Sequence, residues 1–64
     1  MIQLIVERYY NTINKMFYEI RPLYMIKKTY YEIYYRYNDD SEWIYETTKN
    51  SKEAAKKYIK QKGV

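Results

Sequence analysis

The segment Thr29–Thr48 has the sequence TYYEIYYRYNDDSEWIYETT, in which two tyrosine-rich runs flank a short acidic break. Tyrosine, isoleucine, threonine and tryptophan are typical of a pleated, half-buried strand. The break, Asn38–Ser41, consists of residue types whose side chains hydrogen-bond their own backbone in turns. The segment therefore predicts an antiparallel β-hairpin, although the break lacks the glycine that three-residue loops favour.

The register of this hairpin decides which side chains share a face, because a shift of one residue reverses every side chain. We expect Asn38 to pair with Glu42, which places Ile33 opposite Thr47. The mainly apolar face then holds Tyr31, Ile33, Tyr35, Tyr37, Trp43 and Tyr45. The second face holds Tyr30, Glu32, Tyr34, Arg36, Ile44 and Glu46.

A helix is the alternative structure for residues 23–37. Apolar side chains in this segment also recur with a period of 3.6 residues, and Pro22 suits a first helical turn. Aromatic side chains lose rotamer freedom in a helix, so the composition favours strands.

Residues 2–20 predict an amphipathic helix that packs on the hairpin. Apolar residues recur there at spacings of three and four. They are Ile2, Ile5, Val6, Tyr9, Ile13, Met16, Phe17 and Ile20. The opposite face carries two acidic and two basic residues, whereas a helix that lies on a membrane surface is strongly basic.

The rest of the chain predicts a short connection and a second helix. Pro22 ends the first helix, because the residue before a proline avoids the α region. A short third strand at Tyr24–Ile26 remains an open alternative. Asn50 or Ser51 is expected to cap a C-terminal helix, and Gly63 is expected to end it. The expected fold is a single α+β domain over 1–64, of order α-β-β-α, with a helix at about 2–20, a hairpin at about 29–48 and a helix at about 51–62.

The length and composition of the chain indicate whether it needs a second copy for stability. A domain of 64 residues is close to the size at which one core is only marginally stable. No cysteine is present to form a disulfide, and the edges of a lone hairpin stay unpaired. We therefore expect a homodimer formed through the hairpin. A cytoplasmic location without membrane association is expected by default, and the A/T-rich codons of the common residues suggest a phage or mobile element.

Several chemistries are excluded by residue type. Without histidine or cysteine the chain cannot build a Ser–His–Asp or Cys–His pair. Its single glycine, Gly63, cannot form a phosphate-cradling loop. Asp39, Asp40 and Glu42 are better explained as a solvated turn than as Mg²⁺ ligands. The sequence therefore predicts a protein that is not an enzyme and that binds no metal or cofactor.

Two surfaces are candidate binding sites. The first lies on the second face of the hairpin, where tyrosine is a typical interface residue. Its members are Tyr30, Tyr34, Arg36 and Ile44. It predicts an accessory or inhibitory protein that docks on an unidentified partner protein. The second surface is a lysine ridge on the C-terminal helix, whose spacing would allow contacts with phosphates and whose tyrosine neighbours would stack on bases. Its members are Lys49, Lys52, Lys56, Lys57 and Lys60. Nucleic-acid binding through this ridge is the alternative function.

The order of elements resembles that of a double-stranded-RNA-binding domain. Pro22-Leu23-Tyr24 is similar to the Pro-x-Tyr element that precedes the sheet in that family. Ser51-Lys52, which opens a lysine-rich last helix, is similar to the family's phosphate-contacting run. The resemblance would give Lys52, Lys56 and Lys57 the phosphate role. The family's loop histidine and the glycines before its last helix are missing, so the likeness is one of architecture.

Overall fold

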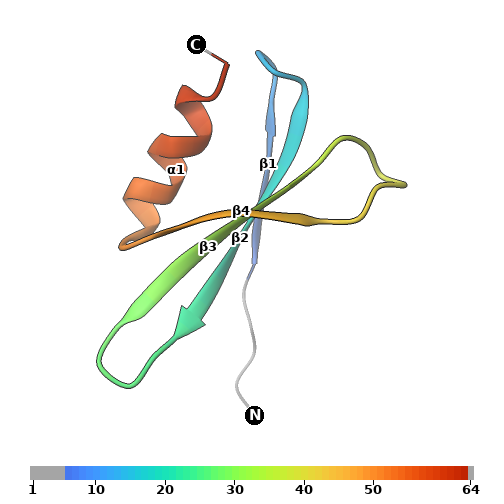
Figure 1. Cartoon of the computed structure of the whole chain (residues 1–64). Helices are drawn as coiled ribbons and strands as arrows, with labels where there is room; N and C mark the ends of the chain where they lie inside the picture. Colours follow the sequence, from blue (N-terminus) through green and yellow to red (C-terminus); the bar gives the residue numbers. More distant parts are fainter. Residues whose placement is uncertain (1–5, 64) are drawn as a thin grey trace.

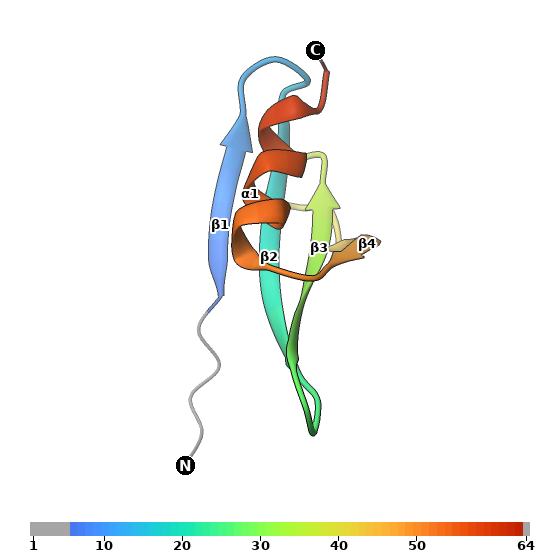
Figure 2. The ribbon, with the colours of Figure 1, turned by 90° about the vertical axis from the view of Figure 1, so that its left-hand side faces the viewer.

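The computed structural model describes residues 6–63 as one four-stranded antiparallel sheet with a helix on one face. The elements are β1 (Glu7–Asn11), β2 (Met16–Tyr24), β3 (Thr29–Arg36), β4 (Ile44–Lys49) and α1 (Lys52–Gln61). The strands lie in the order β1-β2-β3-β4, so each is hydrogen-bonded to its neighbours along the chain. Figure 1 shows α1 on one side of the sheet, and Figure 2 shows it in front of β2, between β1 and β3.

The predicted N-terminal helix is wrong, and the order is β-β-β-β-α instead of α-β-β-α. A turn divides the segment: the side-chain oxygen of Asn11 accepts hydrogen bonds from the backbone N–H groups of Ile13 and Asn14. Lys15 completes the reversal with a φ of 59°. The apolar residues whose three- and four-residue spacings predict a helix therefore lie on both sides of a turn, and their spacing does not reflect a helix. Residues 2–5 of the predicted helix lie outside the described residues.

Pro22 does not end an element but lies inside β2, opposite Tyr31 of β3. A proline lacks the N–H group that a central strand uses on both sides. In the described chain β1 pairs with β2 only as far as Ile20, so Pro22 has a strand neighbour on one side alone. The strand ends at Tyr24, so no separate short strand forms at Tyr24–Ile26, and only Tyr24 of that segment is in a strand.

The hairpin of β3 and β4 has the predicted pairing at its base, where Ile33 lies opposite Thr47. The register then shifts between Ile33 and Tyr34, which leaves Glu46 as an extra residue on β4. Tyr34 consequently faces Tyr45, and Tyr35 faces Ile44. This β-bulge exchanges the predicted faces of Ile44 and Tyr45, because one inserted residue reverses the alternation beyond it.

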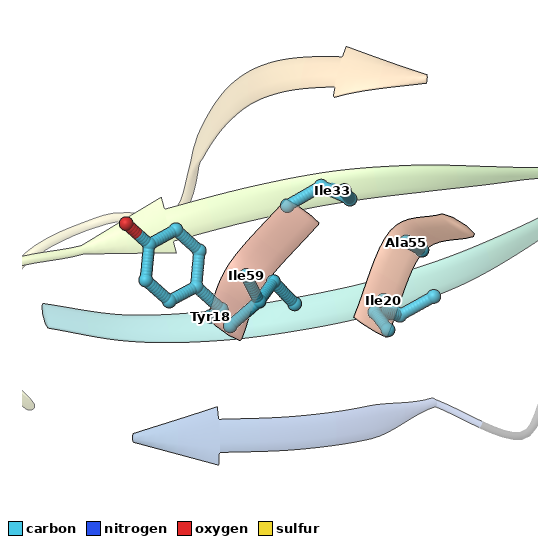
Figure 3. Packing of buried hydrophobic residues seen from close by; sticks show 5 residues of the cluster. All are labelled: Tyr18, Ile20, Ile33, Ala55 and Ile59. Carbon is cyan, nitrogen blue, oxygen red and sulfur yellow. The ribbon is translucent and has the colours of Figure 1, made fainter. Parts of the chain in front are cut away.

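The core lies between α1 and the central strands. Five residues form it, and Figure 3 shows their side chains between the helix and the sheet. They are Tyr18, Ile20, Ile33, Ala55 and Ile59. The alternation of Tyr18 and Ile20 with Phe17 and Glu19 is the strand period of two, with one set turned toward the helix.

The C-terminal helix was predicted correctly. Ser51 is its N-cap, and the Ser51 side chain accepts a hydrogen bond from the backbone N–H of Ala54. The helix ends at Gln61, and Gly63 follows with a φ of 84°, which is a left-handed conformation that suits glycine.

Candidate functional site

The sheet face that α1 leaves uncovered, called the open face here, collects arginine and aromatic side chains. Cross-strand pairs define it as rows that run across the sheet. The rows are Tyr10-Phe17-Arg36, Arg8-Glu19-Tyr34-Tyr45, Arg21-Glu32-Thr48 and Leu23-Tyr30, and Trp43 lies beside them. All three arginines of the chain are therefore on this face.

Glu19 is the electrostatic centre of the open face. Its carboxylate is only 4% exposed and accepts a hydrogen bond of 2.8 Å from Nε of Arg8 and a second one from Nε of Arg21. Burial by itself raises the pKa of this carboxyl group, but the hydrogen bonds from Arg8 and Arg21 outweigh it, and the pKa of Glu19 is lowered. The charged carboxylate thus holds two guanidinium groups in fixed positions.

The aromatic side chains stack on these arginines. The guanidinium carbon of Arg21 lies 3.8 Å from the ring centroid of Tyr34, which is a cation–π distance. Tyr34 in turn meets Tyr45 edge to face, with ring centroids 5.7 Å apart. An ordered stack therefore runs from β2 across β3 to β4.

Trp43 forms the second stack, at the other end of the face. Its ring lies 4.4 Å from the guanidinium carbon of Arg36 and 5.9 Å from that of Arg8. Arg36 also contacts Asp39 at 3.4 Å. The connection between β3 and β4, which carries Asp39 and Trp43, projects on the side of the sheet away from α1 (Figure 1).

The structure places three of the four predicted partner-binding residues together. Tyr30, Tyr34 and Arg36 lie on the open face, and Lys28 lies 5.2 Å from the Tyr30 ring. Ile44 does not lie on the open face. The β-bulge turns its side chain to the face of Tyr35, where Ile44 is 43% exposed.

Sequence reasoning missed the β1 and β2 members of this face. They are Arg8, Tyr10, Phe17, Glu19 and Arg21. The predicted helix over 2–20, ended by Pro22, places these residues outside any sheet, so it does not predict that they lie beside the hairpin. The available signal was the alternation in Tyr18–Arg21, where the charged residues Glu19 and Arg21 alternate with Tyr18 and Ile20.

The predicted lysine ridge lies on and beside α1, on the other side of the sheet. Lys52 contacts Glu7 at 3.3 Å, and Lys49 lies 4.7 Å from the Tyr58 ring. Lys56, Lys57 and Lys60 have no carboxylate within 4.0 Å among residues 6–63. The ridge and the open face are therefore separate surfaces.

The described part of the chain contains no cluster of three or more acidic side chains suited to a metal ion. In residues 6–63 no helix has the length and apolar character needed to cross a membrane. Comparison with protein-family models, with curated proteins and with solved structures finds no match to this chain.

Proposed function

We propose that this protein is a non-enzymatic binding protein that docks the open face of its sheet on a partner protein. The observation that carries the proposal is the packing of all three arginines against aromatic rings, with two of them, Arg8 and Arg21, also held by the buried carboxylate of Glu19. Tyrosine, tryptophan and arginine are the residue types that dominate binding energy in protein interfaces.

Preorganisation supports the same function. Arginine and tyrosine lose side-chain entropy when an interface immobilises them. Here Glu19 and the stacked rings already restrict Arg21 and Tyr34, so less entropy remains to be lost on binding. At the end of β2 the face includes the apolar residue Leu23, which lies opposite Tyr30 and is 39% exposed.

The test begins with a photo-crosslinking amino acid at position 45 on the open face, with position 24 as the control. Tyr24 is 57% and Tyr45 52% exposed, but Tyr24 lies opposite Thr29 on the helix side. We expect position 45 to crosslink one partner, or a second copy of the chain, that position 24 does not.

The affinity of variants of the chain for that purified partner then shows whether the open face is the binding site. We expect Tyr34→Ala to weaken binding by about 1–2 kcal/mol, as at other interface hot spots, and Tyr24→Ala to leave it unchanged. If Lys57→Glu and Lys60→Glu weaken the complex more than Tyr34→Ala does, the open face is not the binding site. Sedimentation of the isolated chain tests the homodimer, since a mass near 8.1 kDa at tens of micromolar excludes it.

Nucleic-acid binding is the second candidate, and the three lysines without a nearby carboxylate favour it. Lys56, Lys57 and Lys60 project from one helix and would neutralise phosphates. The test is binding to mixed DNA and RNA at about 50 and 200 mM salt, where phosphate contacts predict a steep loss of affinity. The tyrosines of the open face cannot join such a contact directly, because the sheet separates them from α1.

A further inference from the structure

The outer edge of β1 has no strand neighbour among the described residues. Within residues 6–63, β1 is the first strand of the sheet and pairs with β2 alone. Every second residue of an edge strand directs its N–H and C=O groups away from the sheet, and an extended peptide can pair with them. The edge of β1 is thus a template for one more strand.

A groove runs beside this edge, between β1 and α1. The core side chains of α1 pack on β2 and β3, and side chains of β1, of the turn after it and of α1 line the space between them. The groove has a volume of about 460 Å³, within the range of ligand sites. We call it the edge groove, and its walls include Tyr9, Asn11, Ile13, Lys56, Ile59 and Lys60.

Two contacts tie the ends of β1 to α1. At the start of the strand, Lys52 Nζ lies 3.3 Å from a carboxylate oxygen of Glu7. At its end, the Asn11 side chain, which lines the groove, donates a hydrogen bond of 2.7 Å to the carbonyl oxygen of Ile59. The strand and the helix that form the walls of the groove are therefore joined to each other.

The chemistry of the edge groove is apolar on its floor and cationic on its helix wall. Ile13 is 56% exposed there, and Tyr9 and Ile59 extend the apolar surface inward. Lys56 and Lys60 are one helical turn apart and face the same groove. An occupant that suits both must carry carboxylates toward the lysines and an apolar side chain toward Ile13.

We propose that the edge groove binds an extended acidic segment of a partner protein, which adds to β1 as a fifth strand. The five residues of β1 would pair with a segment about 17 Å long. Alternate side chains of this segment point into the groove, where carboxylates meet Lys56 and Lys60. The strand edge favours a peptide over a nucleic acid, because only a peptide presents N–H and C=O groups at the spacing of β1. This site is independent of the open face.

The experiment uses the full chain and a blocked synthetic peptide, Ac-Glu-Thr-Glu-Thr-Val-Thr-Glu-NH₂. One set of its alternate positions carries three glutamates and a valine, to face the groove, and the other set carries threonine. We expect binding at about 50 mM salt that weakens at higher salt. Amide hydrogen exchange should slow at alternate residues within 7–11, because only the amides that point away from β2 gain partners. Lys56→Glu and Lys60→Glu should each weaken binding about fivefold, and the matched control Lys57→Glu less than about twofold.

A second probe separates strand addition from charge attraction. N-methylation of alternate amides in the same peptide keeps every charge but removes the donors, so we expect it to abolish binding. Equal binding of the methylated and unmethylated peptides would overturn the proposal, as would failure of the peptide to bind at low salt. Tighter binding of a single-stranded oligonucleotide that displaces the peptide would assign the lysines to nucleic acid instead. None of these outcomes depends on the open face, whose variant Tyr34→Ala should bind the peptide normally.

Discussion

Asn11 and Ile59, 48 residues apart in sequence, are joined by a hydrogen bond of 2.7 Å from the Asn11 side-chain amide to the Ile59 carbonyl. The same amide reaches the carbonyl of Lys62 at 3.0 Å. Its oxygen accepts from the backbone N–H groups of Ile13 and Asn14. One buried side chain therefore closes the first turn and satisfies carbonyls at the end of α1.

Replacement of Asn11 is expected to destabilise the fold strongly. Asn11→Ala leaves two carbonyls and two N–H groups without these partners, so the free energy of unfolding should fall by about 2–3 kcal/mol. Asn11→Asp keeps the acceptor for the turn but loses both donors and places a negative charge against carbonyl oxygens. Chemical denaturation measures both variants. If Asn11→Asp is as stable as the native chain at pH 7, the bond to Ile59 is not a stabilising contact.

Glu19 makes stability depend on acid pH. The folded pKa of Glu19 is lowered by Arg8 and Arg21, below the value of about 4.3 in an unfolded chain. Its contribution is therefore complete above about pH 4.3 and is lost as the pH falls through the folded value. We expect Glu19→Gln to cost about 1–2 kcal/mol at pH 7, since a buried carboxylate with two charged donors is replaced by a neutral group.

The measurement for Glu19 is denaturation of both proteins between pH 7 and about pH 2. The two stability curves should converge in acid, because the native carboxylate is then protonated. Glu42→Gln is the matched control, since Glu42 is exposed in the β3–β4 connection and should change little. A constant difference at every pH would contradict the role of the Glu19 charge.

The sequence predicted the C-terminal half of the fold because its signals there are local. Ser51 lies three residues before the N–H that it caps, and Thr29–Arg36 alternates within one strand. The N-terminal half depends on a contact between residues far apart in the sequence, which has no local sequence signal. Asn11 turns the chain by bonding its own neighbours and also holds α1, so the turn and the helix position are set together by residues 48 apart. The helical spacing of apolar residues across that turn had no competing glycine or proline to break it.

The β3 members of the candidate site could be predicted, again because their signal is local. Tyr34 and Arg36 share a face through simple alternation within β3. Their arginine neighbours come from β1 and β2, which were assigned to a helix. The bulge at Glu46 also has no sequence signal that we recognise, and it alone decides that Tyr45, and not Ile44, joins the open face.

Lys15 is the one non-glycine residue with positive φ among the described residues, at 59°. A side chain in the left-handed region costs about 1–2 kcal/mol, whereas glycine avoids this cost. We expect Lys15→Gly to raise the free energy of unfolding by about 0.5–1 kcal/mol, after the greater freedom of glycine in the unfolded chain is counted. Lys57→Gly, at an exposed position of α1, should lower it by about 1 kcal/mol. A loss of stability in Lys15→Gly would show that the turn does not need this conformation.

Tyr9 makes the fold sensitive to alkali. Burial and the hydrogen bond that its hydroxyl donates to Glu7, 2.6 Å long, raise the pKa of Tyr9 to about 12. An unfolded tyrosine ionises near pH 10, so the folded state holds this proton more tightly. The resulting stability is complete below about pH 10 and is lost as the pH rises toward 12.

Tyr9→Phe should therefore flatten the fall in stability above about pH 10, and it should cost about 1 kcal/mol at neutral pH for the lost hydrogen bond. Denaturation at a series of alkaline pH values measures the slope, and tyrosinate absorbance counts the groups that ionise late. Tyr24→Phe is the control, because Tyr24 is 57% exposed and its removal should leave the slope unchanged. The assignment fails if the native chain and Tyr9→Phe lose stability with the same slope, because another group must then bind the proton that folding retains.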